Sequence, residues 1–206
     1  PANENVYAFL DKVFEEVAAL FPFEYLHMGG DECAKNFWEK SPQVKALMAK
    51  ENLKDMHAVQ SYFVGRVSKI VSSKGKKMIG WDEILDGGLV KSAAVMSWRG
   101  MKGGIQAAKM GHEVVMTPAE FVYVDYMQGD AAFEPHVYSS LRLKKTYQFD
   151  PVPVGVDPKL IKGGQANIWT EQIYNMRHMR YMVWPRGFAI AEALWSPKAN
   201  MNWNTF

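Results

Sequence analysis

The stretch Phe23–Glu32, FEYLHMGGDE, decides how the rest of the chain is interpreted. Its short apolar run breaks at Gly29 and Gly30, and two acidic residues follow at once, so a buried strand that opens into a loop is the simplest interpretation. Neighbouring side chains on a strand point to opposite faces, so Asp31 and Glu32 can serve one ligand only where the backbone turns sharply. Glycine permits such a turn, and crowded carboxylates perturb each other's ionisation. A Gly-Gly turn before an acidic helix start is the alternative.

Composition excludes several partners. The 206 residues fit one domain, 48% of them are hydrophobic, and the net charge of +2 is spread along the chain. We therefore expect no nucleic-acid partner and no anionic-membrane surface. No apolar run approaches the ~18 residues of a membrane span, and the start of the chain shows no export signal. Cys33 is the only cysteine, which excludes an internal disulfide.

Hydrophobic periodicity predicts strands that alternate with helices. The expected helices are residues 4–20, 43–50, 55–73, 105–110, 171–182 and 186–194. The expected strands are one that ends at His27, then residues 77–81, 93–98, 113–116 and 164–169. Acidic and aromatic residues come at or just after the C-terminal ends of these strands. This favours a (β/α)8 TIM-type barrel, whose chemistry lies on that face, over an open α/β sheet that binds ligands at a switch point.

The chain is short for such a barrel. A complete barrel has eight strands and typically ~250 residues, so this chain matches only the fourth strand onward. We expect residues 1–206 to form one partial catalytic barrel domain, as a fragment or the ordered part of a longer protein. Its open sheet edges would need the missing strands, or another chain, to cover them. Because its site is incompletely supported, we expect this chain alone to be poorly active.

Five short motifs span nearly the whole chain. They are HMGGDE at 27–32, GWDE at 80–83, SWRG at 97–100, YVDY at 123–126 and GQANIWTE at 164–171. The first resembles the H-x-G-G-D-E motif of the β-N-acetylhexosaminidases of glycoside hydrolase family 20, and the others follow in that family's order. The resemblance implies a retaining exo-β-N-acetylhexosaminidase that removes terminal GlcNAc or GalNAc from glycans or chitin oligomers. It also implies an extracellular, periplasmic or lysosomal location, where such glycans occur.

The resemblance assigns roles to the acidic residues and one tyrosine. By similarity, Glu32 is the general acid and later the base that activates water. Asp31 orients the N–H of the substrate's own 2-acetamido group, whose oxygen attacks to give an oxazolinium intermediate. Tyr123 matches the tyrosine that binds the acetamido oxygen, and Asp125 and Glu171 match acids that bind sugar hydroxyls. A salt bridge to a nearby lysine or arginine is the alternative for these last two acids.

Trp81, Trp98 and Trp169 match the tryptophans that enclose the sugar in this family. An indole face excludes water and packs against sugar C–H groups, although core tryptophans at strand ends are the alternative. His27 lies inside the first motif and is expected to support the acids rather than to touch substrate. A metal site built from His27 and the two motif acids is not favoured, because no histidine pair completes it. We expect no metal and no cofactor.

Two other functions stay open at this point. The same pocket can serve as a catalytically silent carbohydrate-binding barrel, although the intact pair of acids argues against silence. Alternatively, two separate carboxylates can carry out ordinary double displacement on the same fold.

Overall fold

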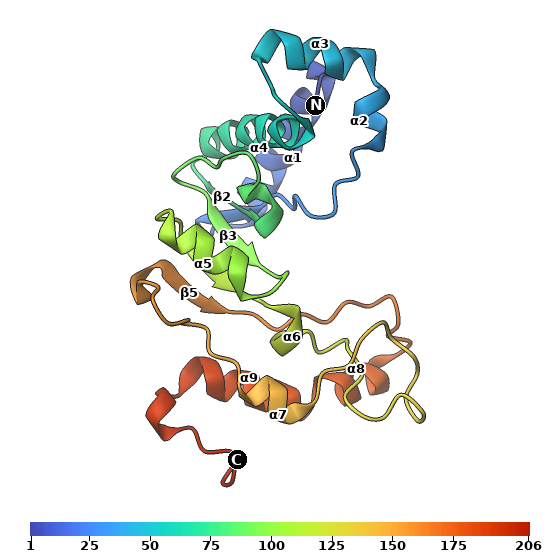
Figure 1. Ribbon diagram of the computed structural model, residues 1–206, viewed down its shortest axis with the longest axis vertical. Coiled ribbons are helices and arrows are strands. Elements are labelled where there is room, and N and C mark those ends of the chain that lie inside the picture. The colour runs from blue at the N-terminus through green and yellow to red at the C-terminus, as the bar shows by residue number, and fades with distance from the viewer. The chain divides into compact units, whose positions relative to one another are not determined.

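The computed structural model describes residues 1–206, which form α/β structure with parallel strand pairs (Figure 1). The chain divides into two compact units, residues 1–96 with 110–113 and residues 97–109 with 114–206. None of the helices combines the length and the hydropathy that a membrane-spanning segment requires.

The first unit pairs three strands in the order in which they occur in the chain. They are β1 (Tyr25–His27), β2 (Lys77–Trp81) and β3 (Ala94–Ser97), whose last residue belongs to the second unit. The helices are α1 (Glu4–Leu20), α2 (Asn36–Lys40), α3 (Pro42–Glu51), α4 (Met56–Ser73) and the short 3-10 helix η1 (Asp82–Leu85). Helix α4 packs against α1 and β2 (Figure 1). Its buried side carries valines at helical spacing, Val59, Val64, Val67 and Val71.

Side-chain caps fix the helix starts of this unit. Asn3 accepts a hydrogen bond from the backbone N–H of Asn5 at the start of α1. Asp55 does the same for Ala58 at the start of α4, at 2.8 Å. These helices confirm the expected ranges to within one residue.

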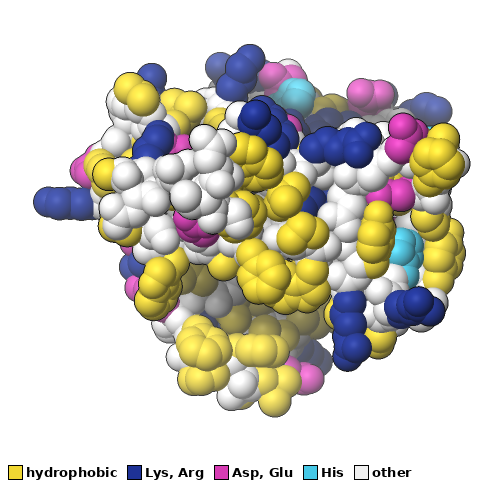
Figure 2. Space-filling view, turned by 90° about the horizontal axis from the view of Figure 1, so that it is seen from below, with side chains coloured by type: hydrophobic (Ala, Val, Ile, Leu, Met, Phe, Trp, Pro, Cys, Tyr) yellow, Lys and Arg dark blue, Asp and Glu magenta, His cyan; other side chains and the backbone are white.

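The second unit contains β4 (Val114–Met116) paired in parallel with β5 (Ile161–Gly164). Its α-helices are α5 (Met101–Lys109), α6 (Ala119–Val122), α7 (Leu143–Tyr147), α8 (Met176–Val183) and α9 (Arg186–Trp195), and its 3-10 helices are η2 (Pro158–Leu160) and η3 (Lys198–Asn200). Helix α7 packs against α9 (Figure 1). Hydrophobic side chains gather on the face of this unit seen in Figure 2. On α9, the exposed fraction is 58% for Phe188 and 92% for Trp195.

The expected last strand, residues 164–169, is wrong. Strand β5 ends at Gly164, where the expected strand begins. Its pairing is interrupted by a register shift, and Gly163 has φ 133°, a conformation that favours glycine. Beyond β5 the backbone makes a single parallel bridge between Asn167 and Tyr123.

Two helices begin elsewhere than expected. Helix α8 begins at Met176 rather than at Glu171, because the side chain of Asn175 caps its first turn. Helix α5 begins at Met101, earlier than expected, directly after Gly100 turns the chain with φ 107°. The segment after the GQANIWTE motif is therefore irregular rather than helical.

Candidate active site

The backbone turns sharply after β1, where the two motif acids lie. Gly29 and Gly30 have φ 78° and 105°, and Glu32, with φ 46°, lies in the left-handed region that side chains rarely occupy. Such strain, on the order of 1–3 kcal/mol, persists only where the surrounding structure holds it, and it clusters at active sites. The turn expected from the sequence is confirmed, and both Asp31 and Glu32 are exposed on it.

Neighbouring elements hold this turn in place. The carbonyl oxygen of Gly29 accepts a hydrogen bond from the backbone N–H of Trp81 at 3.0 Å. The buried amide of Gln60, on α4, donates to the carbonyl oxygen of Gly30 at 2.9 Å. A methyl group added at Gly30 would lie 2.6 Å from Cγ2 of Ile84 in η1, so no larger residue fits without a shift. The two acids are therefore carried on a fixed loop.

His27 supports the turn directly. Its Nδ1 accepts a hydrogen bond from the backbone N–H of Gly29 at 3.0 Å, so the neutral ring carries its proton on Nε2. The ring meets Trp81 edge-on, with 4.9 Å between the ring centroids. Desolvation lowers the pKa of His27, and the nearby Asp31 opposes that shift. His27 thus supports the turn that carries Asp31 and Glu32.

Four motif aromatics meet in the second unit. Tyr123 is buried, and its ring lies 6.3 Å from that of Trp98, nearly parallel, and 6.3 Å from that of Trp169. Tyr126 packs on the same ring at 5.6 Å. Desolvation raises the pKa of Tyr123 to about 12, so its phenol stays protonated and able to donate at neutral pH. We name these four residues the aromatic cluster.

Asp125 is a buried carboxylate that a tyrosine hydroxyl contacts. Its exposed fraction is 3%, and its Oδ2 accepts a hydrogen bond from the hydroxyl of Tyr138 at 3.2 Å. Its Oδ1 is buried and has no hydrogen-bond partner in the protein. Desolvation raises the pKa of Asp125, and the negative charge of Glu171 adds a smaller increase. A buried carboxylate oxygen without a partner is suited to accept a hydrogen bond from a ligand hydroxyl.

Sequence reasoning missed Tyr138, which belongs to no motif. It approaches Asp125 across a loop and meets Tyr126 edge-on, with 5.6 Å between ring centroids. Neither periodicity nor spacing signals that contact. The structure also pairs Asp125 with a tyrosine, not with the lysine or arginine of the salt-bridge alternative.

Sequence reasoning also missed Arg186, at the start of α9. Its exposed fraction is 0%, and desolvation lowers its pKa to about 10, so it stays charged at neutral pH. Its guanidinium donates to the carbonyl oxygens of Val124, Tyr126, Leu141 and Met182. It therefore anchors both ends of the loop that carries Tyr138. It also binds the carbonyl groups of Val124 and Tyr126, the residues on either side of Asp125. The sequence feature that could have pointed to Arg186 is an arginine at the start of an otherwise largely apolar helix.

The expected site residues fall into two sets. The first unit holds His27, Asp31, Glu32 and Trp81, and the second holds Trp98, Tyr123, Asp125, Trp169 and Glu171. Within the first unit His27 contacts Trp81, and within the second Trp98 and Trp169 contact Tyr123. The chain contains no group of three histidine, cysteine, aspartate or glutamate side chains arranged to hold a metal ion.

Comparisons with known proteins agree on one family. The model "Glycosyl hydrolase family 20, catalytic domain" matches residues 1–198. A β-hexosaminidase of Porphyromonas gingivalis is 42% identical over 99% of the chain, and one of Vibrio furnissii is 38% identical over 93%. The chain spans 27% and 32% of these relatives' own lengths.

A solved structure gives the same result in three dimensions. The exo-β-N-acetylglucosaminidase of Vibrio harveyi, in complex with N-acetylglucosamine, is 38% identical and superimposes with a TM-score of 0.91. The match covers 100% of this chain and 33% of that one. It confirms the expected fold class, a partial (β/α)8 barrel.

Proposed function

The chain belongs to the glycosyl hydrolase family 20 catalytic domain, and on that premise we propose that the protein is a retaining exo-β-N-acetylhexosaminidase. Its substrates are terminal GlcNAc or GalNAc residues of glycans or chitin oligomers. The observation that carries this proposal is the strained turn that presents Asp31 and Glu32 side by side, with Glu32 at φ 46°. We further propose an extracellular, periplasmic or lysosomal location, which fractionation of source cells tests.

The two acids divide the work of the reaction. Glu32 protonates the glycosidic oxygen as the bond from that oxygen to the anomeric carbon breaks. The substrate's acetamido oxygen bonds to the same carbon, and Asp31 stabilises the positive charge that develops on the acetamido N–H. Water then opens the oxazolinium ion, with Glu32 as the base that takes its proton. Two successive inversions give net retention.

The second unit supplies groups suited to hold the sugar. The protonated phenol of Tyr123 donates to the acetamido oxygen, and Trp98 and Trp169 pack beside that tyrosine. The carboxylate of Asp125 accepts a hydrogen bond from one sugar hydroxyl, and the carboxylate of Glu171 accepts one from a second.

Kinetics of acid variants in the full-length protein test this proposal. With 4-nitrophenyl N-acetyl-β-glucosaminide, we expect Asp31→Asn and Glu32→Gln each to lower kcat by roughly 10²–10⁴-fold. Glu39→Gln, an exposed acid on the neighbouring helix α2, is the matched control and should leave kcat unchanged. Wild-type turnover by both site variants would refute the assignment.

Two further measurements separate the alternatives. A thiazoline that mimics the oxazolinium ion should bind far more tightly than N-acetylglucosamine, because an enzyme is complementary to its transition state. Equal affinities together with no turnover would instead indicate a carbohydrate-binding protein. A sugar covalently attached to a carboxylate, detected by mass spectrometry, would indicate double displacement.

A further inference from the structure

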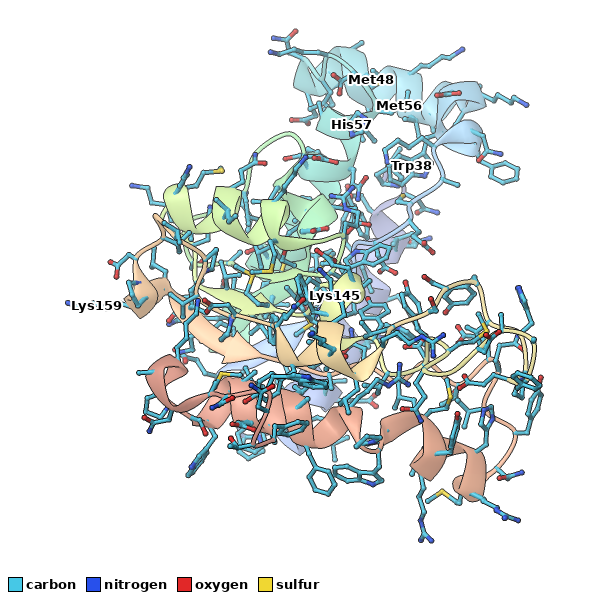
Figure 3. The ribbon with its side chains drawn as sticks, turned by 60° about the horizontal axis from the view of Figure 1, so that its bottom comes forward. Trp38, Met48, Met56, His57, Lys145 and Lys159 are labelled. Carbon is cyan, nitrogen blue, oxygen red and sulfur yellow. The ribbon has the colours of Figure 1, made fainter.

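A polar residue of the GQANIWTE motif is buried beside the aromatic cluster. Asn167 lies just beyond β5, the strand that follows Lys159 in Figure 3, and its exposed fraction is 6%. Burying a carboxamide costs free energy unless its donor and acceptor atoms are both engaged. The side chain of Asn167 therefore requires a hydrogen-bond partner at each end.

The backbone brings Asn167 next to Tyr123. These two residues form the parallel bridge beyond β5. The N–H of Asn167 donates to the carbonyl oxygen of Val122 at 3.0 Å, and its own carbonyl oxygen accepts from the N–H of Val124 at 2.8 Å. Residues paired in this way carry their side chains on the same face of the two strands. The carboxamide of Asn167 and the phenol of Tyr123 therefore leave the backbone side by side.

Gln165 sets the direction of this carboxamide. Its Nε2 donates to Oδ1 of Asn167 at 2.7 Å. A carboxamide has an acceptor oxygen on one side and two N–H donors on the other, so a donor bound to Oδ1 turns Nδ2 the opposite way. Nδ2 of Asn167 is buried and makes no hydrogen bond of ordinary geometry in the protein. Its N–H groups are therefore available to a neighbouring acceptor.

The hydroxyl of Tyr123 is that acceptor. Desolvation raises the pKa of Tyr123 to about 12, and the side chains of Asn167 and then Trp169 oppose the rise. A donor near the phenol oxygen favours the phenolate, so both side chains direct N–H groups towards this oxygen. Hydrogen bonds of catalytic sites are often long before the substrate binds and shorten with it. A hydroxyl whose oxygen faces two donors keeps one role, which is to donate its own proton.

We propose that Asn167 is a positioning residue, whose amide N–H donates to the Tyr123 hydroxyl and so directs the phenol proton at the acetamido oxygen of the substrate. This inference rests on the proposed function and adds a residue to it. Tyr123 then holds the acetamido oxygen near the anomeric carbon without first having to turn its own O–H. Groups oriented in advance in this way lower the barrier to reaction.

Two substitutions of Asn167 test this role in the full-length protein. With 4-nitrophenyl N-acetyl-β-glucosaminide, Asn167→Ala should lower kcat/KM by roughly tenfold, the size of one hydrogen bond. Asn167→Asp keeps the shape of the side chain and the acceptor for Gln165, but it replaces the donor by an acceptor that draws the phenol proton away from the substrate. It should therefore lower kcat/KM more than Asn167→Ala does. If Asn167 only filled space, the isosteric aspartate would be the milder change.

A double-mutant cycle with Tyr123 isolates the contact. If Asn167 acts through the phenol, Asn167→Ala should have no further effect on kcat/KM in a Tyr123→Phe background, whereas independent roles would multiply. Asn200→Asp, the same chemical change at an exposed asparagine of η3, is the matched control and should leave kcat/KM unchanged.

Circular dichroism at the assay temperature establishes which variants are folded. If the aspartate variant does not fold, the cycle with the alanine variant decides alone. Effects that multiply in the cycle, or a folded aspartate variant milder than the alanine variant, would overturn the inference.

Failure of the proposed function gives a different result. If the wild-type protein does not hydrolyse the glycoside, the proposed activity is wrong, and calorimetry with N-acetylglucosamine then measures the same cycle on Kd. A loss of affinity in Asn167→Ala that disappears in the Tyr123→Phe background supports the contact. No measurable binding, or effects that multiply, would contradict it.

Discussion

The smallest feature on which the site depends is the hydrogen bond from Gly29 to His27. A backbone N–H only donates, so the bond lasts only while Nδ1 of His27 is unprotonated. Protonation of the ring therefore removes a support from the turn that carries Asp31 and Glu32. This makes the turn sensitive to mild acid.

We predict that His27 makes the protein less stable as the pH falls. Desolvation holds its folded-state pKa below the ordinary histidine value of 6.5, so the unfolded chain takes up a proton first. The stability that neutral His27 contributes is complete above pH 6.5. It is lost as the pH falls from 6.5 towards the folded-state pKa of His27. The fall in Tm between about pH 7.5 and about pH 5.5 should be smaller in His27→Asn, whose amide oxygen can still accept from Gly29.

A control histidine separates this effect from general acid destabilisation. His136 is exposed on a loop of the second unit, so His136→Asn should keep the wild-type pH dependence. The same fall in Tm for His27→Asn as for the wild type would show that His27 does not govern it.

We also predict a role in substrate binding for Tyr138. Tyr138→Phe removes the hydrogen bond to Oδ2 of Asp125, which favours the charged carboxylate, so the already raised pKa of Asp125 should rise further. KM should increase by roughly tenfold, the size of one hydrogen bond to a charged group, and the acid limb of the kcat/KM profile should move to higher pH. Tyr174→Phe, at an exposed tyrosine, is the control. An unchanged KM and acid limb would contradict this role.

At the scale of elements, the junction of β1 with its turn depends on a glycine that has no room for a side chain. Gly30→Ala would strain φ 105° and clash with Ile84, so we predict a loss of ~2–4 kcal/mol in the free energy of unfolding. Gly65, inside α4, has nothing within 4 Å of an added methyl group. Gly65→Ala should therefore stabilise by ~0.5–1 kcal/mol. Urea unfolding measures both, and equal shifts would show that the junction is not under steric constraint.

Elements with their own local signal were predictable from the sequence. Helices α1 and α4 follow from 3.6-residue periodicity and from the caps Asn3 and Asp55. The strand expected at 164–169 failed because an apolar, glycine-containing run does not reveal that pairing ends at Gly164. Pairing depends on the partner strand, which no window of local sequence contains.

In the candidate site too, some residues have a local sequence signal and others do not. Residues such as Asp31, Glu32 and Tyr123 were identified because they stand in motifs, and the roles proposed for them come with the family. Tyr138 contacts Asp125 from 13 residues away, and three of the four residues whose carbonyl groups Arg186 binds lie 45 to 62 residues away, so these contacts depend on the fold. Composition and spacing carry no information about such contacts.

At the scale of the whole molecule, the chain spans about a third of its relatives and exposes apolar surface. Besides the aromatics on α9, large exposed side chains include Phe9, Phe21 and Phe23 in the first unit. Large apolar side chains exposed in this way in each unit are typical of contacts with further protein. We propose that additional barrel strands, in the same chain or another, cover these side chains.

We predict that residues 1–206 alone are poorly active. A site whose supports are incomplete loses roughly 100-fold in rate for misplacements of about 1 Å. The kcat/KM of the isolated chain on an aryl N-acetyl-β-glucosaminide should thus be at least ~100-fold below that of a protein with a complete barrel. Circular dichroism and size-exclusion chromatography establish that the isolated chain is folded and monodisperse. Turnover near that of the complete barrel would contradict the prediction.

The division of labour between Asp31 and Glu32 is tested most directly by azide rescue of Glu32→Gln in the full-length protein. The substrate is an aryl N-acetyl-β-glucosaminide whose leaving group departs without protonation, so the oxazolinium ion still forms but water lacks its base. We expect azide to restore turnover and NMR to show a β-glycosyl azide, the product of retention. An unchanged rate with no glycosyl azide, or a sugar covalently bound to a carboxylate, would contradict the proposed roles.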